Sequence, residues 1–63
     1  MGTHGIKVKS PGEKIWYFLR SNGGETRLRI HAGLTTPEKA AIIAAEVEEL
    51  NPGVKAKVVQ IFG

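Results

Sequence analysis

A single helix signal lies past the middle of this 63-residue chain, between strand-like segments. Thr36 can cap a helix with its hydroxyl, Pro37 suits the first helical position, and Glu38 complements the helix dipole. Asn51-Pro52-Gly53 ends the run because proline cannot continue a helix. The apolar positions between these ends recur at helical spacing. They are Ala40, Ile43, Ala44, Val47 and Leu50. We therefore expect one helix that covers a sheet with this stripe.

Two runs of strand type precede the helix, residues 15–20 and 26–31. Asn22-Gly23 between them is typical of a two-residue hairpin, because a type I′ turn needs positive φ at both central positions. In that register Phe18 pairs with Arg27. Shifting the turn by one residue changes the partners but keeps the faces, whereas a three-residue turn would flip one strand.

A first strand is predicted by the alternation of residues 6–9. Pro11-Gly12 then indicates a turn, either tight or part of a wider loop. With a tight turn, Lys7 faces Trp16. Residues 54–62 resemble a last strand, which can lie beside either the first strand or the third.

The elements therefore follow the order β-β-β-α-β, which predicts one small α+β domain over residues 1–63. We expect an antiparallel meander, one C-terminal strand, and a helix packed on one sheet face, with residues 1–5 disordered. The chain has no cysteine, which excludes disulfides and thiolate chemistry and favours a cytoplasmic location. No apolar run approaches the roughly 20 residues of a membrane span, and the first residues lack the apolar stretch of a signal peptide.

The residue pattern gives little indication of a catalytic site or of a cofactor site. No histidines and carboxylates have metal-ligand spacing, and Gly23-Gly24 joins strands instead of opening a phosphate-binding helix. We therefore predict no metal, no cofactor and no enzymatic activity.

The expected strand register gathers basic and aromatic residues on the sheet face that points away from the helix. The set comprises Lys7, Lys9, Trp16, Phe18, Arg20, Arg27 and Arg29, with Lys55 and Lys57 joining from the last strand. The charge is also polarised along the chain. Residues 36–50 carry one lysine against four glutamates, a net −3, while the remainder carries eight cations against two glutamates, a net +6.

Such a face suits nucleic acid, because clustered cations displace counterions from phosphates and exposed rings stack on unpaired bases. The leading hypothesis is a small non-catalytic protein of phage or bacterial type that binds DNA or RNA. The alternative is an interaction module that uses the same face to form a homodimer or to bind another protein.

Three families share parts of this pattern. Residues 6–50, with Ile15-Trp16-Tyr17, the Asn-Gly turn and Thr36-Pro37 entering a helix, resemble the arm-type DNA-binding domains of tyrosine recombinases. That resemblance implies a sheet that enters a DNA groove. The last strand lies outside it.

Gly2-Thr3-His4 is similar to the Gly-Ser-His signature of HicA-type toxin ribonucleases, which implies a catalytic role for His4. The helix that precedes this signature in the family is missing here. Residues 36–59 resemble half of a peptidoglycan-binding SPOR repeat, without the second half.

Overall fold

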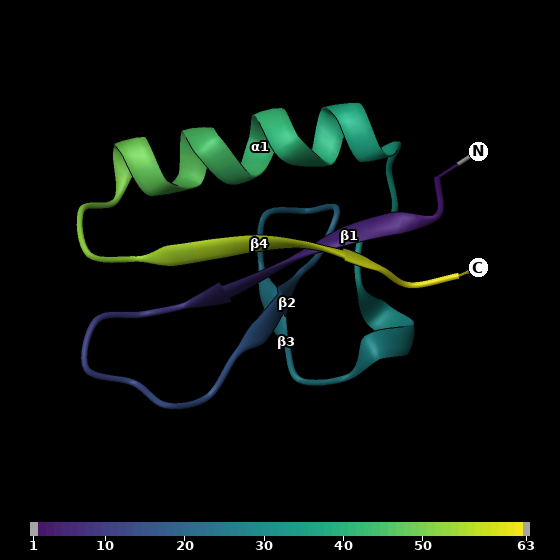
Figure 1. Cartoon of the computed structure of the whole chain (residues 1–63). Coiled ribbons are helices and arrows are strands. Elements are labelled where there is room, and N and C mark those ends of the chain that lie inside the picture. The colour runs from purple at the N-terminus through teal and green to yellow at the C-terminus, as the bar shows by residue number, and fades with distance from the viewer. Residues whose placement is uncertain (1, 63) are drawn as a thin grey trace.

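The computed structural model describes residues 2–62, which form a single sheet covered on one face by a helix (Figure 1). The strands are β1 (His4–Lys9), β2 (Tyr17–Leu19), β3 (Glu25–Thr26) and β4 (Lys55–Gln60). The helices are a short 3-10 helix, η1 (Arg29–His31), and α1 (Pro37–Leu50). All strand pairs are antiparallel, in the order β3-β2-β1-β4. The predicted α+β fold is confirmed.

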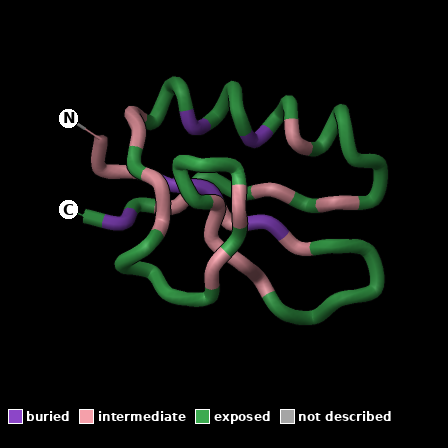
Figure 2. Tube along the Cα trace, turned by 180° about the vertical axis from the view of Figure 1, so that it is seen from behind, coloured by how far each residue is buried: buried purple, intermediate pink, exposed green. Residues whose placement is uncertain are grey.

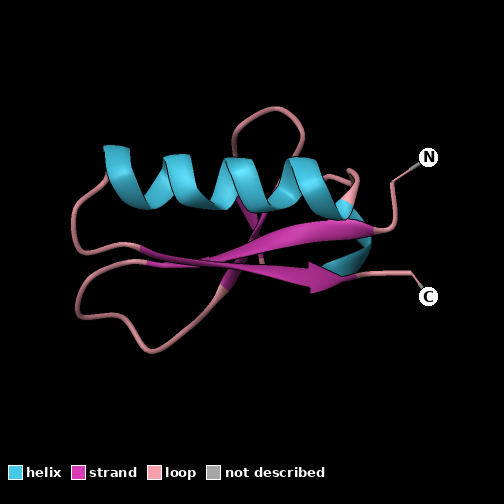
Figure 3. Ribbon diagram, turned by 45° about the horizontal axis from the view of Figure 1, so that its top comes forward, coloured by secondary structure: helices cyan, strands magenta, loops and turns pink. Residues whose placement is uncertain are grey.

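Helix α1 begins and ends at the predicted residues. Thr36 is the N-cap, and its Oγ1 accepts a hydrogen bond of 3.3 Å from the Lys39 backbone N–H. The helix lies over β4 and β1, as Figure 3 shows. Ala40 and Ala44 are buried, but Leu50 at the end of the predicted stripe is 77% exposed. The expectation of a fully covered stripe is therefore wrong at its C-terminal end.

The β1–β2 pairing differs from the tight-turn register by two residues. Lys7 pairs with Phe18 and Val8 with Tyr17, so the wider loop alternative applies to residues 10–16. A shift of two residues preserves parity, because side chains alternate between faces with a period of two. Tyr17 consequently still packs against the core.

The β2–β3 hairpin has a three-residue turn, so the predicted two-residue turn is wrong. Arg20 N–H donates to the Gly24 carbonyl over 2.8 Å, and Gly23 N–H donates back to the Arg20 carbonyl over 3.0 Å. Gly23 has a φ of +89°, which glycine adopts without strain. Phe18 therefore pairs with Thr26 and not with Arg27.

This change of parity also affects the arginines that follow β3. Had the strand continued to His31 as predicted, Arg27 and Arg29 would have pointed to the helix side of the sheet and not to the outer face. The chain instead leaves the sheet after Thr26, whose Oγ1 accepts a hydrogen bond from the Leu28 backbone N–H. The predicted strand over residues 26–31 is thus replaced by a turn and η1.

Strand β4 lies at an edge of the sheet, beside β1. Ile61 N–H bonds to the Thr3 carbonyl, so the backbone groups of odd-numbered residues in β4 point toward β1. Because the direction of these groups alternates along an antiparallel ladder, the N–H and C=O groups of even-numbered residues point away from β1. Two side chains bond to these edge groups. Glu48 Oε2 accepts from the Ala56 N–H over 2.9 Å, and Arg29 Nη2 donates to the Gln60 carbonyl over 2.6 Å.

The core lies between α1 and the inner sheet face and is small. It consists of Ile6, Val8, Ala40 and Ala44, with five partly buried neighbours around it. Figure 2 shows buried segments in the helix, in a strand beneath it and next to the C-terminus, while most of the loop segments are exposed. A core of this size leaves several apolar side chains at the surface.

The N-terminal segment is part of the sheet, although residues 1–5 are predicted to be disordered. His4 and Gly5 form the start of β1, and Met1 lies outside the described residues. A Cβ atom at Gly5 would lie 3.2 Å from Ile61 Cγ1 and 3.1 Å from the Gly33 carbonyl oxygen. This end of the outer face is therefore covered, and the opposite end remains open.

Candidate nucleic-acid interface

The open part of the outer sheet face carries four lysines and two aromatic rings. The ladders place five of these residues on the side opposite α1, and Trp16 joins them through its contacts with three of the lysines. The full set is Lys7, Lys9, Trp16, Phe18, Lys55 and Lys57. We call this set the lysine face. These residues come from β1, from β4, and from Phe18 of β2 and the residue before that strand, so the sheet brings together three separate segments of the chain.

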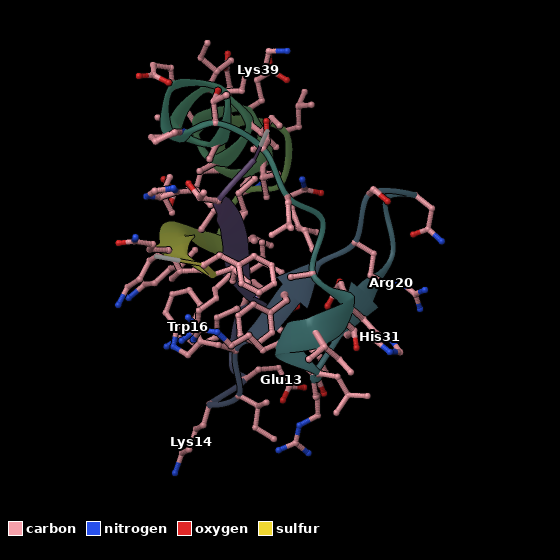
Figure 4. The ribbon with its side chains drawn as sticks, turned by 90° about the vertical axis from the view of Figure 1, so that its right-hand side faces the viewer. Glu13, Lys14, Trp16, Arg20, His31 and Lys39 are labelled. Atoms are coloured by element: carbon pink, nitrogen blue, oxygen red, sulfur yellow. The ribbon has the colours of Figure 1, made fainter. Side chains whose placement is uncertain are left out.

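Trp16 is the centre of the lysine face. The Nζ atoms of Lys57, Lys9 and Lys7 lie 4.8, 5.5 and 5.8 Å from its ring centroid. Lys7 Nζ is also 5.9 Å from the ring centroid of Phe18. These distances are typical of cation–π contacts, and both rings are half-buried. Figure 4 shows the Trp16 side chain among several side-chain nitrogen atoms, on the opposite side of the ribbon from Arg20.

The charges on the lysine face are not balanced within the sheet. Lys7 pairs directly with Lys57, and Lys9 with Lys55, an arrangement that is unfavourable between like charges. The other outer-face positions of β1, β2 and β4 are Gly5, Phe18 and Val59, and none is a carboxylate. The face therefore carries four positive charges, three of them around one indole.

The three arginines of the predicted site lie elsewhere. Arg20 follows β2 and lines a groove beside α1, and Arg27 is exposed between β3 and η1. Arg29 lies in η1, and its guanidinium bonds to the carbonyls of Gln60 and Ile61. The predicted positions of Arg27 and Arg29 depended on a long third strand, whereas the sheet contains only Glu25–Thr26 of it. The predicted position of Arg20 depended on a second strand that reaches residue 20, whereas β2 ends at Leu19. No sequence pattern indicates that Arg29 bonds to the open edge of β4, because its partner Gln60 lies 31 residues away in the chain.

His4 is the first residue of β1. Its Nδ1 lies 2.8 Å from Thr3 Oγ1, a contact between neighbours in sequence. Among residues 2–62, no group of three or more histidines and acidic residues could hold a metal ion. In the same range, no helix is long and apolar enough to cross a membrane.

Comparisons with known proteins add no functional information. No family model, no curated protein and no solved structure matches this chain.

Proposed function

We propose that this protein binds nucleic acid through the lysine face, without catalysis. The single observation that supports this function best is the cluster of three lysine ammonium groups within 6 Å of one half-buried indole. In this proposal the lysines contact phosphates, and Trp16 and Phe18 stack on unpaired bases. The absence of cysteine from the sequence is compatible with the reducing cytoplasm, where we place this activity.

The energetics of the free protein support an anionic ligand. Cross-strand lysine pairs repel each other, and a row of phosphates would relieve this repulsion while releasing counterions. Aromatic rings contribute about 1–3 kcal/mol per stacked base, largely independent of sequence. Because the rings lie on a sheet surface and not on a protruding ribbon, we expect single strands to bind more tightly than duplexes.

The same charges argue against a homodimer through this face. A two-fold interface brings the same patch of both chains together, so four lysines would meet four lysines. An acidic protein partner would not have this problem, and it is the competing outcome of the binding test.

The direct test is a titration of Trp16 fluorescence with a single-stranded oligonucleotide at about 50 mM salt, where the electrostatic contribution is strong. We expect a change in emission on binding, and weaker binding to a duplex of the same sequence. Lys57→Glu should weaken binding about tenfold or more, because it removes a positive charge that lies 4.8 Å from the stacking ring and adds a negative charge to the same face.

The matched control is Lys39→Glu, which makes the same change of charge on α1. Lys39 is exposed on the helix, on the opposite side of the molecule from Trp16 (Figure 4). Equal losses of affinity in the two variants would mean that only the net charge of the protein matters for binding. No binding by the unaltered protein at about 50 mM salt would refute the proposal.

A further inference from the structure

The lysine face is small. Along the strands it contains two levels of the β1–β4 ladder, the pair Lys7–Lys57 and the pair Lys9–Lys55. Two residues of a strand span about 7 Å, and three neighbouring strands span about 10 Å between the outer two. A ligand of this face therefore meets four lysines and two aromatic rings over about 7 Å by 10 Å of sheet.

The next level of the same ladder is covered. Gly5 pairs with Val59 there, and it lies on the outer side of β1 because it is two residues before Lys7. A Cβ atom at Gly5 would lie 3.1 Å from the Gly33 carbonyl oxygen and 3.2 Å from the side chain of Ile61, which is itself buried. A nucleic-acid strand that runs along β1 must consequently leave the sheet before Gly5.

The segment that covers this level is fixed to the sheet. Arg29 Nη2 in η1 donates to the Gln60 carbonyl over 2.6 Å and to the Ile61 carbonyl over 3.3 Å. Gly33 N–H donates to the Leu19 carbonyl over 2.8 Å. Figure 1 shows η1 at the end of the sheet where both termini lie. Because both ends of this segment are bonded to other parts of the chain, we expect the cover to stay in place when a ligand binds.

The other borders of the lysine face add no net positive charge. Beyond Lys9 the chain continues into the uncharged residues 10–12, and the charges of Glu13 and Lys14 then cancel. At the open edge of β4, Glu48 Oε2 accepts the hydrogen bond of the Ala56 N–H, so this border carries a carboxylate. Phosphates that lie outside the lysine face therefore gain little electrostatic attraction.

We propose that the lysine face takes a short unpaired segment of nucleic acid, in which about four nucleotides make all of the contacts, a proposal that rests on the function inferred above. One phosphate for each lysine gives the number of backbone contacts, and Trp16 and Phe18 each present one ring to a base. A longer single strand then offers more positions for the same site but does not bind more tightly at any of them. Strand ends, loops and bulges contain unpaired segments of this kind.

A length series of oligothymidylates, followed by Trp16 fluorescence at about 50 mM salt, tests this inference. Affinity should rise steeply only up to about six nucleotides. A twelve-mer offers about three times as many positions for a four-nucleotide site as a six-mer, so we expect about a threefold gain between them. A gain of about tenfold or more would show contacts outside the lysine face and would overturn the inference.

The salt dependence of the same complexes is a second, independent readout. The slope of log K against log salt should be equal for the six-mer and the twelve-mer, because both make the same phosphate contacts. A slope that is steeper by about 0.7 or more for the twelve-mer would mean an additional phosphate contact and would contradict a short site. No binding at either length would instead refute the proposed function itself, and this inference with it.

Backbone amide shifts in ¹⁵N–¹H NMR spectra test the covered end directly. The amides of Gly5, Gly33 and Ile61 should have the same shifts in the six-mer and twelve-mer complexes, since the longer strand leaves the sheet before it reaches them. Larger changes at these three amides with the twelve-mer would mean that the strand passes over the cover, and the inference would be wrong.

Discussion

Single residues decide how charge and aromatic surface meet on this protein. Trp16 immediately precedes β2, and its ring lies within 6 Å of lysines from both β1 and β4. The neighbouring Tyr17 points the other way and packs against the core. A shift of one residue in β2 would exchange these two rings, so the candidate interface depends on the parity of this strand.

Replacing the central ring gives the first prediction. Trp16→Ala should weaken oligonucleotide binding by about 1–3 kcal/mol, which is 5- to 150-fold, because a stacking surface is lost. Trp16→Phe, which keeps a flat ring, should retain most of the affinity. The measurement is fluorescence anisotropy of a labelled oligonucleotide, and equal affinity of Trp16→Ala and the unaltered protein would rule out stacking on Trp16.

The N-cap of α1 gives a second prediction at this scale. Thr36→Ala should lower the free energy of unfolding by about 1 kcal/mol, because the Lys39 N–H loses its side-chain acceptor. Thr35→Ala is the matched control, since the bonds of Thr35 to His4 come from its backbone. Urea denaturation compares the two variants, and a control that is as unstable as Thr36→Ala would contradict the assignment of the cap.

At the level of elements, the sequence was sufficient for α1 and for the parity of β1 and β2. The helix carries its own start and stop signals, from Thr36 to Asn51, and alternation fixes which side of a strand is buried. The hairpin turn was not predictable in the same way. Asn22-Gly23 fits a two-residue turn, yet the hairpin has a turn of three residues. This difference of one residue places Arg27 and Arg29 away from the candidate site.

The other features that could not be predicted from the sequence depend on contacts between segments far apart in the chain. The position of β4 beside β1, the covered end of the outer face and the groove beside α1 each join segments far apart in the chain. No local periodicity encodes such pairings. The exposed Ile43 was assigned to the core because helical spacing indicates a face but not how much of it is covered.

The segment between η1 and α1 yields a prediction for this scale. Gly33 N–H bonds to the Leu19 carbonyl, and a Cβ atom at Gly33 would lie 2.7 Å from the backbone nitrogen of Ser21. Gly33→Ala should therefore lower the free energy of unfolding by about 1–3 kcal/mol, because the backbone at Ser21 or at Gly33 must move to make room for the methyl group.

Gly24→Ala provides the comparison for that experiment. A Cβ atom at Gly24 would lie 3.1 Å from Asn22 Oδ1, which accepts a hydrogen bond from the Gly24 N–H. Because this neighbour is an exposed side chain and not backbone, the expected loss is smaller. Thermal unfolding of both variants measures the difference. Equal stability of Gly33→Ala and the unaltered protein would mean that this segment does not pack as described.

At the scale of the whole molecule, two layers carry opposite charge. Residues 36–50, which contain α1, carry a net −3, while the rest of the chain carries +6, so an anionic ligand is drawn toward the sheet. The groove beside α1 lies on the helix side of the sheet, and the lysine face lies on the other.

The salt dependence of binding provides a prediction at this scale. Four lysines that each neutralise one phosphate of a single strand give a slope of log K against log salt of about −3, at roughly −0.7 per contact. Lys57→Ala should reduce the magnitude of this slope by about 0.7. Titrations at several salt concentrations measure the slope, and a value near zero would exclude phosphate contacts by the lysine face.

The most direct measurement of where nucleic acid binds is a two-dimensional ¹⁵N–¹H NMR titration with a single-stranded oligonucleotide. The largest shift changes should occur at the Trp16 indole and at the backbone amides of Lys7, Lys9 and Lys57, while those of α1 change little. Changes concentrated on α1 or the groove, or no changes at all at low salt, would contradict the proposed role of the lysine face.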